Sequence, residues 1–152
     1  MPKQSAGILV YRKHNNQLQV LLVHPGGPFF SKKDLGAWSI PKGEFTTEDP
    51  LTAAIREFKE ELGIDIAGNF HHLAPVKLKS GKIVHAWAIE ADLDISQTVS
   101  NTFTIEWPPR SGKMQEFSEV DKVEWFTIGE AKEKINGAQV GFIEELVRIT
   151  HL

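Results

Sequence analysis

One predicted helix constrains the fold of this chain more than any other segment. It covers residues 50–62, PLTAAIREFKEEL, and both of its ends are marked. Asp49 suits the N-cap, Pro50 suits the first helical position, and Gly63 suits the left-handed residue that often follows a helix. Apolar side chains recur at i, i+4, i+7 and i+11, which predicts one continuous buried face. The residues of that face are Leu51, Ile55, Phe58 and Leu62.

Three glutamates gather near the end of this helix, away from its apolar face: Glu57, Glu60 and Glu61. Carboxylates three and four residues apart repel one another, and near a helix C-terminus they also face the negative end of the dipole. A solvated acidic surface is one interpretation of such a charge run. A bound cation is the other, and we favour it because the preceding PKG turn lets the backbone approach a ligand at Gly43. Oxygen ligands without Cys or His suit a hard ion, Mg²⁺ or Mn²⁺.

The segments before the helix favour β-structure. Residues 5–12 and 17–24 are rich in branched apolar side chains and predict two strands, joined as a hairpin through Asn15 and Asn16. A Gly- and Pro-rich loop is expected over 25–36, followed by a short strand at AWSI that delivers the chain to the PKG turn.

Strands and two further helices are expected after the first helix. The strand-like runs are joined by short turns, and the last two segments have helical spacing. The expected elements are a hairpin of 72–79 with 82–93, an irregular stretch over 106–121, a strand over 122–128, and helices over 128–135 and 140–152, the last with a core stripe of Phe142, Leu146 and Ile149.

Composition limits the remaining choices of class. The chain has 152 residues, 41% of them hydrophobic and 24% charged, which suits one globular domain over residues 1–152. There is no cysteine, so disulfides and thiolate metal sites are excluded. The net charge of −3 argues against a DNA-binding surface and, more mildly, against a long RNA partner. The apolar run of residues 6–10 is too short for a membrane span, and we expect a cytoplasmic protein.

The residues around the glutamate helix resemble the Nudix box. That motif is a glycine, five residues, a glutamate, seven residues, and then Arg-Glu-apolar-any-Glu-Glu-any-Gly-apolar. The matching residues are Gly43, Glu48, Arg56, Glu57, Phe58, Glu60, Glu61, Gly63 and Ile64. One departure is that only four residues separate Gly43 from Glu48, so the loop is one residue short. The strand order resembles the family's α/β/α sandwich with a mixed β-sheet over nearly the whole chain.

The resemblance implies a Mg²⁺-dependent hydrolase that cleaves a pyrophosphate linkage in a nucleoside diphosphate joined to another group. Such attack of water on phosphorus needs charge neutralisation and an activated nucleophile, which clustered divalent ions provide. By analogy with the family, Arg56 orients a box glutamate and Glu48 braces the loop against the helix. The metal ligands by the same analogy are Glu57, Glu60, Glu61 and the carbonyl of Gly43.

A second acid often comes from a distant loop in this family, as a further ligand or as the general base. The sequence QEFSEVDKVEWF contains two candidates, Glu116 and Glu119. Glu119 stands six residues before Trp125, a spacing similar to the base-bearing loop of several family members, so we prefer Glu119. A solvated loop acid without a role is the alternative interpretation, and the sequence leaves the general base open among Glu57, Glu116 and Glu119.

Three cations are candidates for holding substrate phosphate. Lys42 lies in the PKG turn, and Arg110 and Lys113 form a small basic loop in WPPRSGK. Surface solubility explains these side chains as well. Trp107 and the other strand tryptophans are possible stacking partners for a base, although a tryptophan in a strand more often belongs to the core.

Three functions follow from this sequence. The first is hydrolysis of a nucleoside polyphosphate or dinucleoside polyphosphate, a small-molecule substrate. The second is removal of pyrophosphate from triphosphorylated RNA 5′ ends. The third is a Nudix-like module that senses a nucleotide without catalysis, against which the full set of Glu57, Glu60 and Glu61 counts. Either a monomer or a homodimer is compatible with the sequence.

Overall fold

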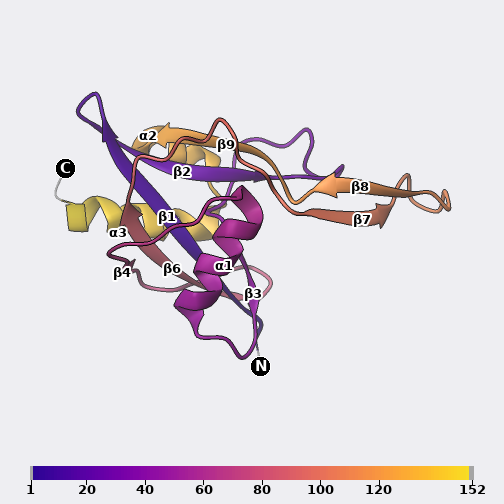
Figure 1. Ribbon diagram of the computed structural model, residues 1–152, viewed down its shortest axis with the longest axis horizontal. Coiled ribbons are helices and arrows are strands. Elements are labelled where there is room, and N and C mark those ends of the chain that lie inside the picture. The colour runs from indigo at the N-terminus through magenta and orange to yellow at the C-terminus, as the bar shows by residue number, and fades with distance from the viewer. Residues whose placement is uncertain (1, 151–152) are drawn as a thin grey trace.

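The computed structural model describes residues 2–150, in which a seven-stranded sheet carries three helices and a separate two-stranded ribbon (Figure 1). The strands of the main sheet are β1 (Gln4–His14), β2 (Gln17–Pro25), β3 (Lys42–Phe45), β4 (His71–His72), β5 (Val76–Lys77), β6 (Ile83–Glu90) and β9 (Val120–Thr127). The ribbon consists of β7 (Thr102–Glu106) and β8 (Met114–Ser118). The helices are α1 (Pro50–Leu62), α2 (Ile128–Lys134) and α3 (Val140–Thr150), with a 3₁₀ turn η1 (Gly137–Gln139) before α3.

Strand β1 organises the sheet, whose main order is β4-β6-β1-β2-β9. It pairs in parallel with β6 along one edge. Its other edge is shared, because the first half of β1 pairs antiparallel with β3 and the second half antiparallel with β2. This arrangement holds β3, and with it Gly43, against the middle of the sheet.

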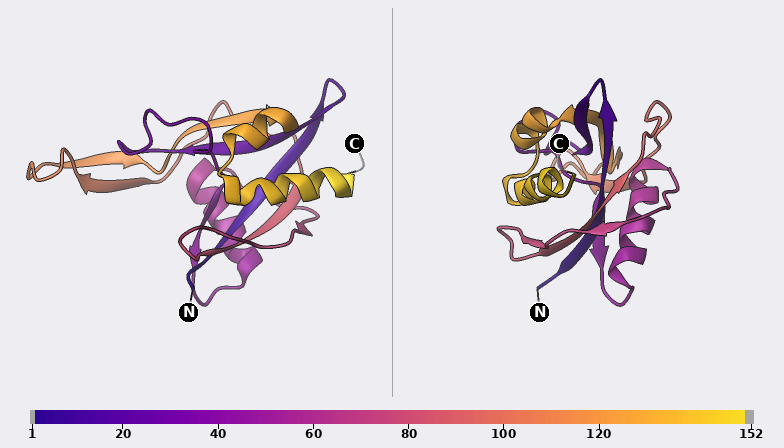
Figure 2. Two further views of the ribbon diagram at one scale, coloured as in Figure 1. Left: turned by 180° about the vertical axis from the view of Figure 1, so that it is seen from behind. Right: turned by 90° about the vertical axis from the view of Figure 1, so that its left-hand side faces the viewer.

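The helices cover both faces of the sheet, α1 on one side and α2 with α3 on the other (Figure 2). Each face has its own buried cluster. The cluster under α1 includes Ile8, Leu21 and Phe58, and the cluster under α2 and α3 includes Leu22 and Phe142. The predicted α/β/α sandwich with a mixed sheet is confirmed.

Helix α1 has the ends that the sequence predicts. The carboxylate of Asp49 accepts from the backbone N–H of Thr52 at 3.1 Å, and Gly63 has a left-handed φ of 73°. The buried face is displaced from the predicted one, because Leu51 and Ile55 are only partly buried. Ala53, Ala54, Phe58 and Leu62 are the fully buried residues. Small alanines let α1 lie close to the sheet, and burying Phe58 and Leu62 contributes about 2 kcal/mol each.

Several strand predictions need correction. Residues 37–40 form only isolated bridges, Val23 with Ser39 and Trp38 with Ile135. The predicted strand 72–79 is reduced to β4 and β5, two residues each. Lys42 and Gly43 of the PKG segment, expected to be a turn, belong to β3. In each case pairing with β1, β2 or β6 decides the outcome, since local sequence does not specify a partner strand.

The prediction that residues 106–121 form an irregular stretch was wrong. Its ends belong to a hairpin of β7 and β8, which we call the arm, with residues 107–113 as its tip. Alternation places Phe103 and Phe117 opposite one another on one face of the arm. The two prolines and the glycine of this stretch, Pro108, Pro109 and Gly112, are confined to the tip. In Figure 1 the arm projects away from the sheet.

The other predictions are met closely. Asn15 and Asn16 both have positive φ, 51° and 62°, as a two-residue hairpin turn requires. Helices α2 and α3 lie where expected, with Phe142 and Leu146 buried; the last two positions of the predicted helix 140–152 are outside the described residues. Within residues 2–150, no helix is long and apolar enough to cross a membrane.

Candidate active site

Arg56 lies at the centre of the acidic end of α1 and binds three carboxylates. Its Nη2 donates to Glu48 at 2.6 Å, and its Nε lies 3.0 Å from the second oxygen of Glu48. Its Nη1 donates to Glu57 at 2.9 Å and to Glu60 at 3.1 Å. These hydrogen bonds hold the pKa of Glu48 below its ordinary value. The loop therefore brings Glu48 to α1 although it is one residue short.

Gly43 is the residue over which Glu57 lies. A β-carbon built at Gly43 would overlap the carboxyl group of Glu57, so only glycine leaves room for this approach of β3 and α1. Burial raises the pKa of Glu57, and the neighbouring charge of Glu60 raises it further. The backbone of β3 at Gly43 and the carboxyl group of Glu57 are thus in direct contact.

Glu61 is the most strongly perturbed acid of the site. Its Oε1 accepts from the backbone N–H of Lys42 at 3.3 Å. Burial raises the pKa of Glu61 to about 8, although the positive charge of Lys42 opposes the shift. The pKa of Lys42 is lowered, first by burial and then by the charge of Lys82. A carboxylate with these surroundings binds a proton or a cation more readily than an exposed one.

Glu119 joins the site from the root of the arm, between β8 and β9. Its N–H donates to the carbonyl of Asn101 at 2.8 Å, and the N–H of Asn101 donates to the carbonyl of Glu60 at 2.8 Å. Burial and the charge of Glu60 raise the pKa of Glu119. Glu116 instead lies out on β8, where it is exposed. The structure brings Glu119, and not Glu116, to the glutamates of α1; its role as a base stays a prediction.

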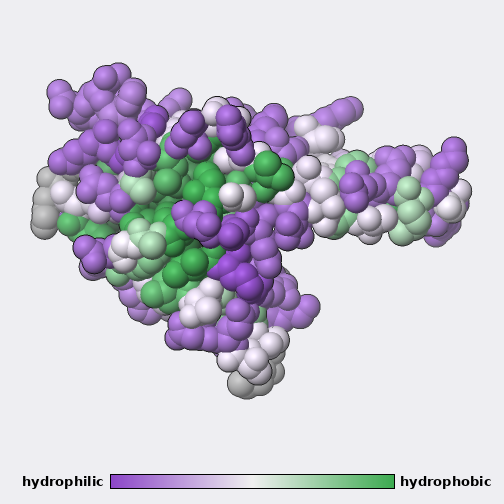
Figure 3. All heavy atoms as spheres, in the orientation of Figure 1, coloured by the Kyte–Doolittle hydropathy of each residue, from purple (hydrophilic) through white to green (hydrophobic). Residues whose placement is uncertain are grey.

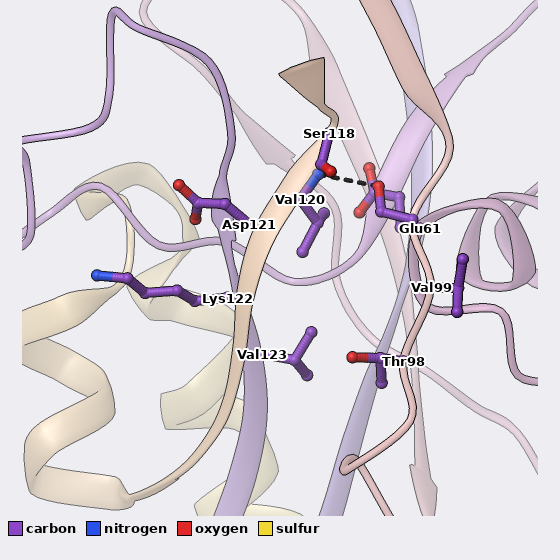
Figure 4. Close-up of a pocket in the computed structure, with 9 residues that line it drawn as sticks. Glu61, Thr98, Val99, Ser118, Val120, Asp121, Lys122 and Val123 are labelled. Carbon is purple, nitrogen blue, oxygen red and sulfur yellow. Dashed lines mark hydrogen bonds between the residues drawn. The ribbon is translucent and has the colours of Figure 1, made fainter. Parts of the chain in front are cut away.

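A cavity of about 380 Å³ opens beside Glu61, between β9 and the segment 98–100 (Figure 4). Thr98, Val120 and Val123 point toward the space, whereas Asp121 and Lys122 extend away from Glu61. The N–H of Val120 donates to Ser100 Oγ at 3.0 Å and ties the two walls together. The sequence does not predict a role for Thr98, Val99 and Ser100, because they belong to no motif.

The remaining predicted residues are divided between the site and the arm. Lys42 lies at the carboxylates, as described above. Arg110 and Lys113 are exposed at the tip of the arm, beyond two strands of five residues. At about 3.3 Å per residue, the arm alone separates them from its root by roughly 16 Å. Trp107 lies at the start of the tip, while Trp38 is buried in the core.

The carboxylate oxygens of the site suit a hard divalent cation, but in this structure they accept hydrogen bonds from Arg56 and from the backbone. Glu57 and Glu60 bind Arg56, and Glu61 binds a backbone N–H. Among residues 2–150, no three His, Asp or Glu side chains converge as a metal site. The donor set fits Mg²⁺ or Mn²⁺ in kind. A cation would replace Arg56 as the positive charge beside Glu57 and Glu60.

Comparison with known proteins gives the family. The sequence matches the NUDIX domain over residues 1–146. This chain belongs to the Nudix hydrolase family. The prediction from the box residues is confirmed, and Nudix membership supports the predicted enzyme class, a pyrophosphohydrolase. No curated protein matches the sequence significantly.

Solved Nudix structures share the fold. A C. elegans Ap4A hydrolase binary complex has 22% identity, covers 99% of each chain and has a TM-score of 0.69. The NUDIX domain of Shewanella oneidensis NrtR complexed with ADP ribose has 15% identity, covers 99% of this chain and 89% of that chain, and has a TM-score of 0.68. MutT protein from Methanosarcina mazei has 16% identity, coverage of 99% and 97%, and a TM-score of 0.63. At such identities the likeness concerns the fold alone.

Proposed function

We propose that this Nudix protein acts as one domain over residues 1–152 and hydrolyses a pyrophosphate bond in a nucleoside polyphosphate or dinucleoside polyphosphate, by attack of water at phosphorus. The observation that carries the proposal is the set of carboxylates around Arg56 and Gly43, next to a cavity bounded by Glu61. Similarity to an Ap4A hydrolase and to a NUDIX domain complexed with ADP ribose supports a nucleotide substrate.

The proposed metal ligands are Glu57, Glu60, Glu61 and the carbonyl of Gly43. Bound Mg²⁺ or Mn²⁺ would neutralise phosphate oxygens and lower the pKa of a coordinated water. Before the cation binds, Arg56 donates to both Glu57 and Glu60 and holds the two side chains close together. After it binds, Arg56 still holds Glu48 and so keeps the loop against α1.

Glu119 is the proposed general base. Its raised pKa makes it a better proton acceptor than an ordinary carboxylate, provided that it is deprotonated at the working pH. It stands across from Glu60 and Glu61, where it can accept a proton from an attacking water. Lys42 is proposed to bind a phosphate of the substrate from the floor of the site, since its charge lies beside Glu61.

The test is a hydrolysis panel with and without divalent ion. The purified protein is incubated with dinucleoside polyphosphates, nucleoside triphosphates, ADP ribose and triphosphorylated RNA, and phosphate and pyrophosphate are measured. We expect at least one substrate to be hydrolysed with Mg²⁺ or Mn²⁺, and turnover to stop in excess chelator. Hydrolysis that continues in chelator contradicts the metal assignment.

A non-catalytic sensor is the alternative function, favoured by the similarity to the ligand-bound NrtR domain. It predicts saturable binding of a nucleotide with no product from any substrate of the panel. The acids described above argue against it, because a binding-only module does not need a full ligand set.

A further inference from the structure

His24 is a buried side chain for which the proposed reaction has no role. It lies near the end of β2 and is only 1% exposed. Its ring packs edge to face on Trp38, with 5.2 Å between the ring centroids. Its Nδ1 lies 2.7 Å from a carboxylate oxygen of Asp121, and its Nε2 lies 2.6 Å from the carbonyl oxygen of Lys33. A buried ring with both nitrogens engaged holds two chain segments together.

Asp121 reaches His24 because the pairing of β2 with β9 is irregular at this point. The register shifts between His24 and Pro25. Pro25 pairs with Val120, so Asp121 is left as the extra residue of a β-bulge. A bulge can turn a side chain of the strand in a new direction. In Figure 4 the carboxylate of Asp121 extends away from Glu61, and the hydrogen bond to His24 accounts for that direction.

Glu119 is attached on the other side of the same bulge, two residues before Asp121. Its N–H donates to the carbonyl of Asn101 at 2.8 Å, and its carbonyl accepts from the N–H of Gly26 at 2.9 Å. Gly26 itself follows His24 by two residues. The end of β2 and the start of β9 are therefore joined twice, by a backbone hydrogen bond and by a side-chain hydrogen bond.

The arm contributes little to the placement of Glu119. Neither β7 nor β8 has a buried residue, and in the space-filling view the arm extends from the body of the molecule with many hydrophilic residues along it (Figure 3). Glu119 follows β8 directly. A segment with few buried contacts moves more easily than the core, so the chain has to be fixed at the root of the arm. The buried ring of His24 provides that fixed point.

We propose that His24 is a positioning residue for Glu119. Its hydrogen bond to Asp121 holds the bulge, and the bulge places the carboxylate of Glu119 across from the glutamates of α1. The inference rests on the proposed function for the role of Glu119 as the general base. Loss of the bond to Asp121 therefore slows the chemical step and leaves substrate binding unchanged, because a catalytic group displaced by about 1 Å is much less effective.

Two amide substitutions separate the contact with Asp121 from the contact with Lys33. The amide nitrogen of asparagine takes about the place of Nδ1, so His24→Asn keeps the donor toward Asp121. The amide nitrogen of glutamine reaches about as far as Nε2, so His24→Gln keeps only the donor toward Lys33. We expect His24→Gln to lower kcat about fivefold with KM within about twofold, and His24→Asn to keep kcat within about twofold. Both variants lose the ring, so a general loss of packing affects them alike.

A double variant shows whether the effect passes through Glu119. The base is already absent in Glu119→Gln, so adding His24→Gln should change kcat by less than about twofold. A residue that only stabilises the fold would lower kcat by the same factor in either background. His72→Gln is the matched control and should keep wild-type kcat. The ring of His72 also packs on a tryptophan, at 4.7 Å from Trp87, but it lies on β4.

Amide hydrogen exchange, followed by NMR, tests the junction without any turnover. The N–H groups of Gly26 and Glu119 are the donors that close the root of the arm. Exchange of both should become at least about tenfold faster in His24→Gln, because the bulge is released. In His24→Asn and in His72→Gln the rates should stay within about threefold of wild type.

Three results would overturn the inference. His24→Asn loses as much kcat as His24→Gln, or the effects of His24→Gln and Glu119→Gln multiply in the double variant. In the third, the amides of Gly26 and Glu119 exchange at wild-type rates in His24→Gln. A failure of the proposed function looks different, because the wild-type protein then hydrolyses no substrate. The exchange rates still decide in that case whether His24 holds the junction.

Discussion

The acidic end of α1 and the arm are neighbours, but they differ in how firmly the core holds them. Helix α1 is anchored by Phe58 and Leu62, which are fully buried, and its three glutamates are held by Arg56 and a backbone N–H. The arm has no buried residue in either strand and contacts the rest of the protein through its root and one loop. The carboxylates that are proposed to share one cation lie on α1, which the core anchors. Exposed cationic side chains and partly exposed rings lie on the arm.

The difference teaches where a change should matter. A partly buried carboxylate that is held by fixed partners determines the geometry of its site, so replacing it alters the site directly. An exposed strand residue is surrounded by water that replaces lost contacts, and most changes there should be small. Variants of matched chemistry in the two regions can therefore test whether the contrast is real.

The largest effect is expected from Glu60→Gln and Glu61→Gln. Each removes a negative charge proposed to hold the cation while keeping the shape of the side chain, so kcat should fall at least about a hundredfold with the fold retained. Steady-state kinetics and circular dichroism measure the two quantities. Glu116→Gln on the arm is the matched control and should keep normal turnover. Near-normal kcat in Glu60→Gln or Glu61→Gln would remove these residues from the metal site.

Gly43→Ala should have the next largest effect. The added methyl group would overlap the carboxyl group of Glu57, so the side chain has to turn away and the contact of β3 with α1 loosens. We expect kcat to fall about thirtyfold and the unfolding free energy to decrease by about 1 to 3 kcal/mol. Gly129→Ala in α2 is the control, because nothing lies within 4 Å of its added β-carbon. Equal behaviour of the two variants contradicts the close approach.

Glu119→Gln tests the point where the arm meets the site. A general base acts in the chemical step, so kcat should fall at least about tenfold with little change in KM. The raised pKa of Glu119 should also appear as the acidic limb of the pH profile of kcat/KM, and this limb should be lost in the variant. A larger loss in Glu116→Gln than in Glu119→Gln would assign the base to the arm instead.

The smallest effect concerns the stability of the metal-free protein. The pKa of Glu61 rises from 4.5 to about 8 on folding, so between these values the folded chain keeps a proton that the unfolded chain has released. Stability from this group is complete below pH 4.5 and is lost as the pH rises toward 8. Thermal unfolding in chelator should thus give a Tm that declines over this range. The decline should be weaker in Glu61→Gln and unchanged in Glu116→Gln.

The sequence determined what depends on local chemistry. Asp49, Pro50 and Gly63 define α1 because capping and left-handed backbone are properties of single residues and their neighbours. Two asparagines define the first hairpin for the same reason. The spacing of Arg56 and the glutamates pointed to the family, since a fixed spacing on one helix determines which side chains share a face.

Tertiary structure decided whatever depends on distant partners. Local pattern did not reveal β3, because its pairing with β1 joins residues far apart in the chain. The spacing from Trp125 favoured Glu119 over Glu116 only by similarity to the family, whereas the return of the chain to the sheet after β8 places Glu119 beside the glutamates of α1. The pKa of Glu61 and the cavity beside it arise from residues 42, 98–100 and 120, which come together only on folding. Burial and strand pairing are long-range quantities, and spacing along the sequence does not contain them.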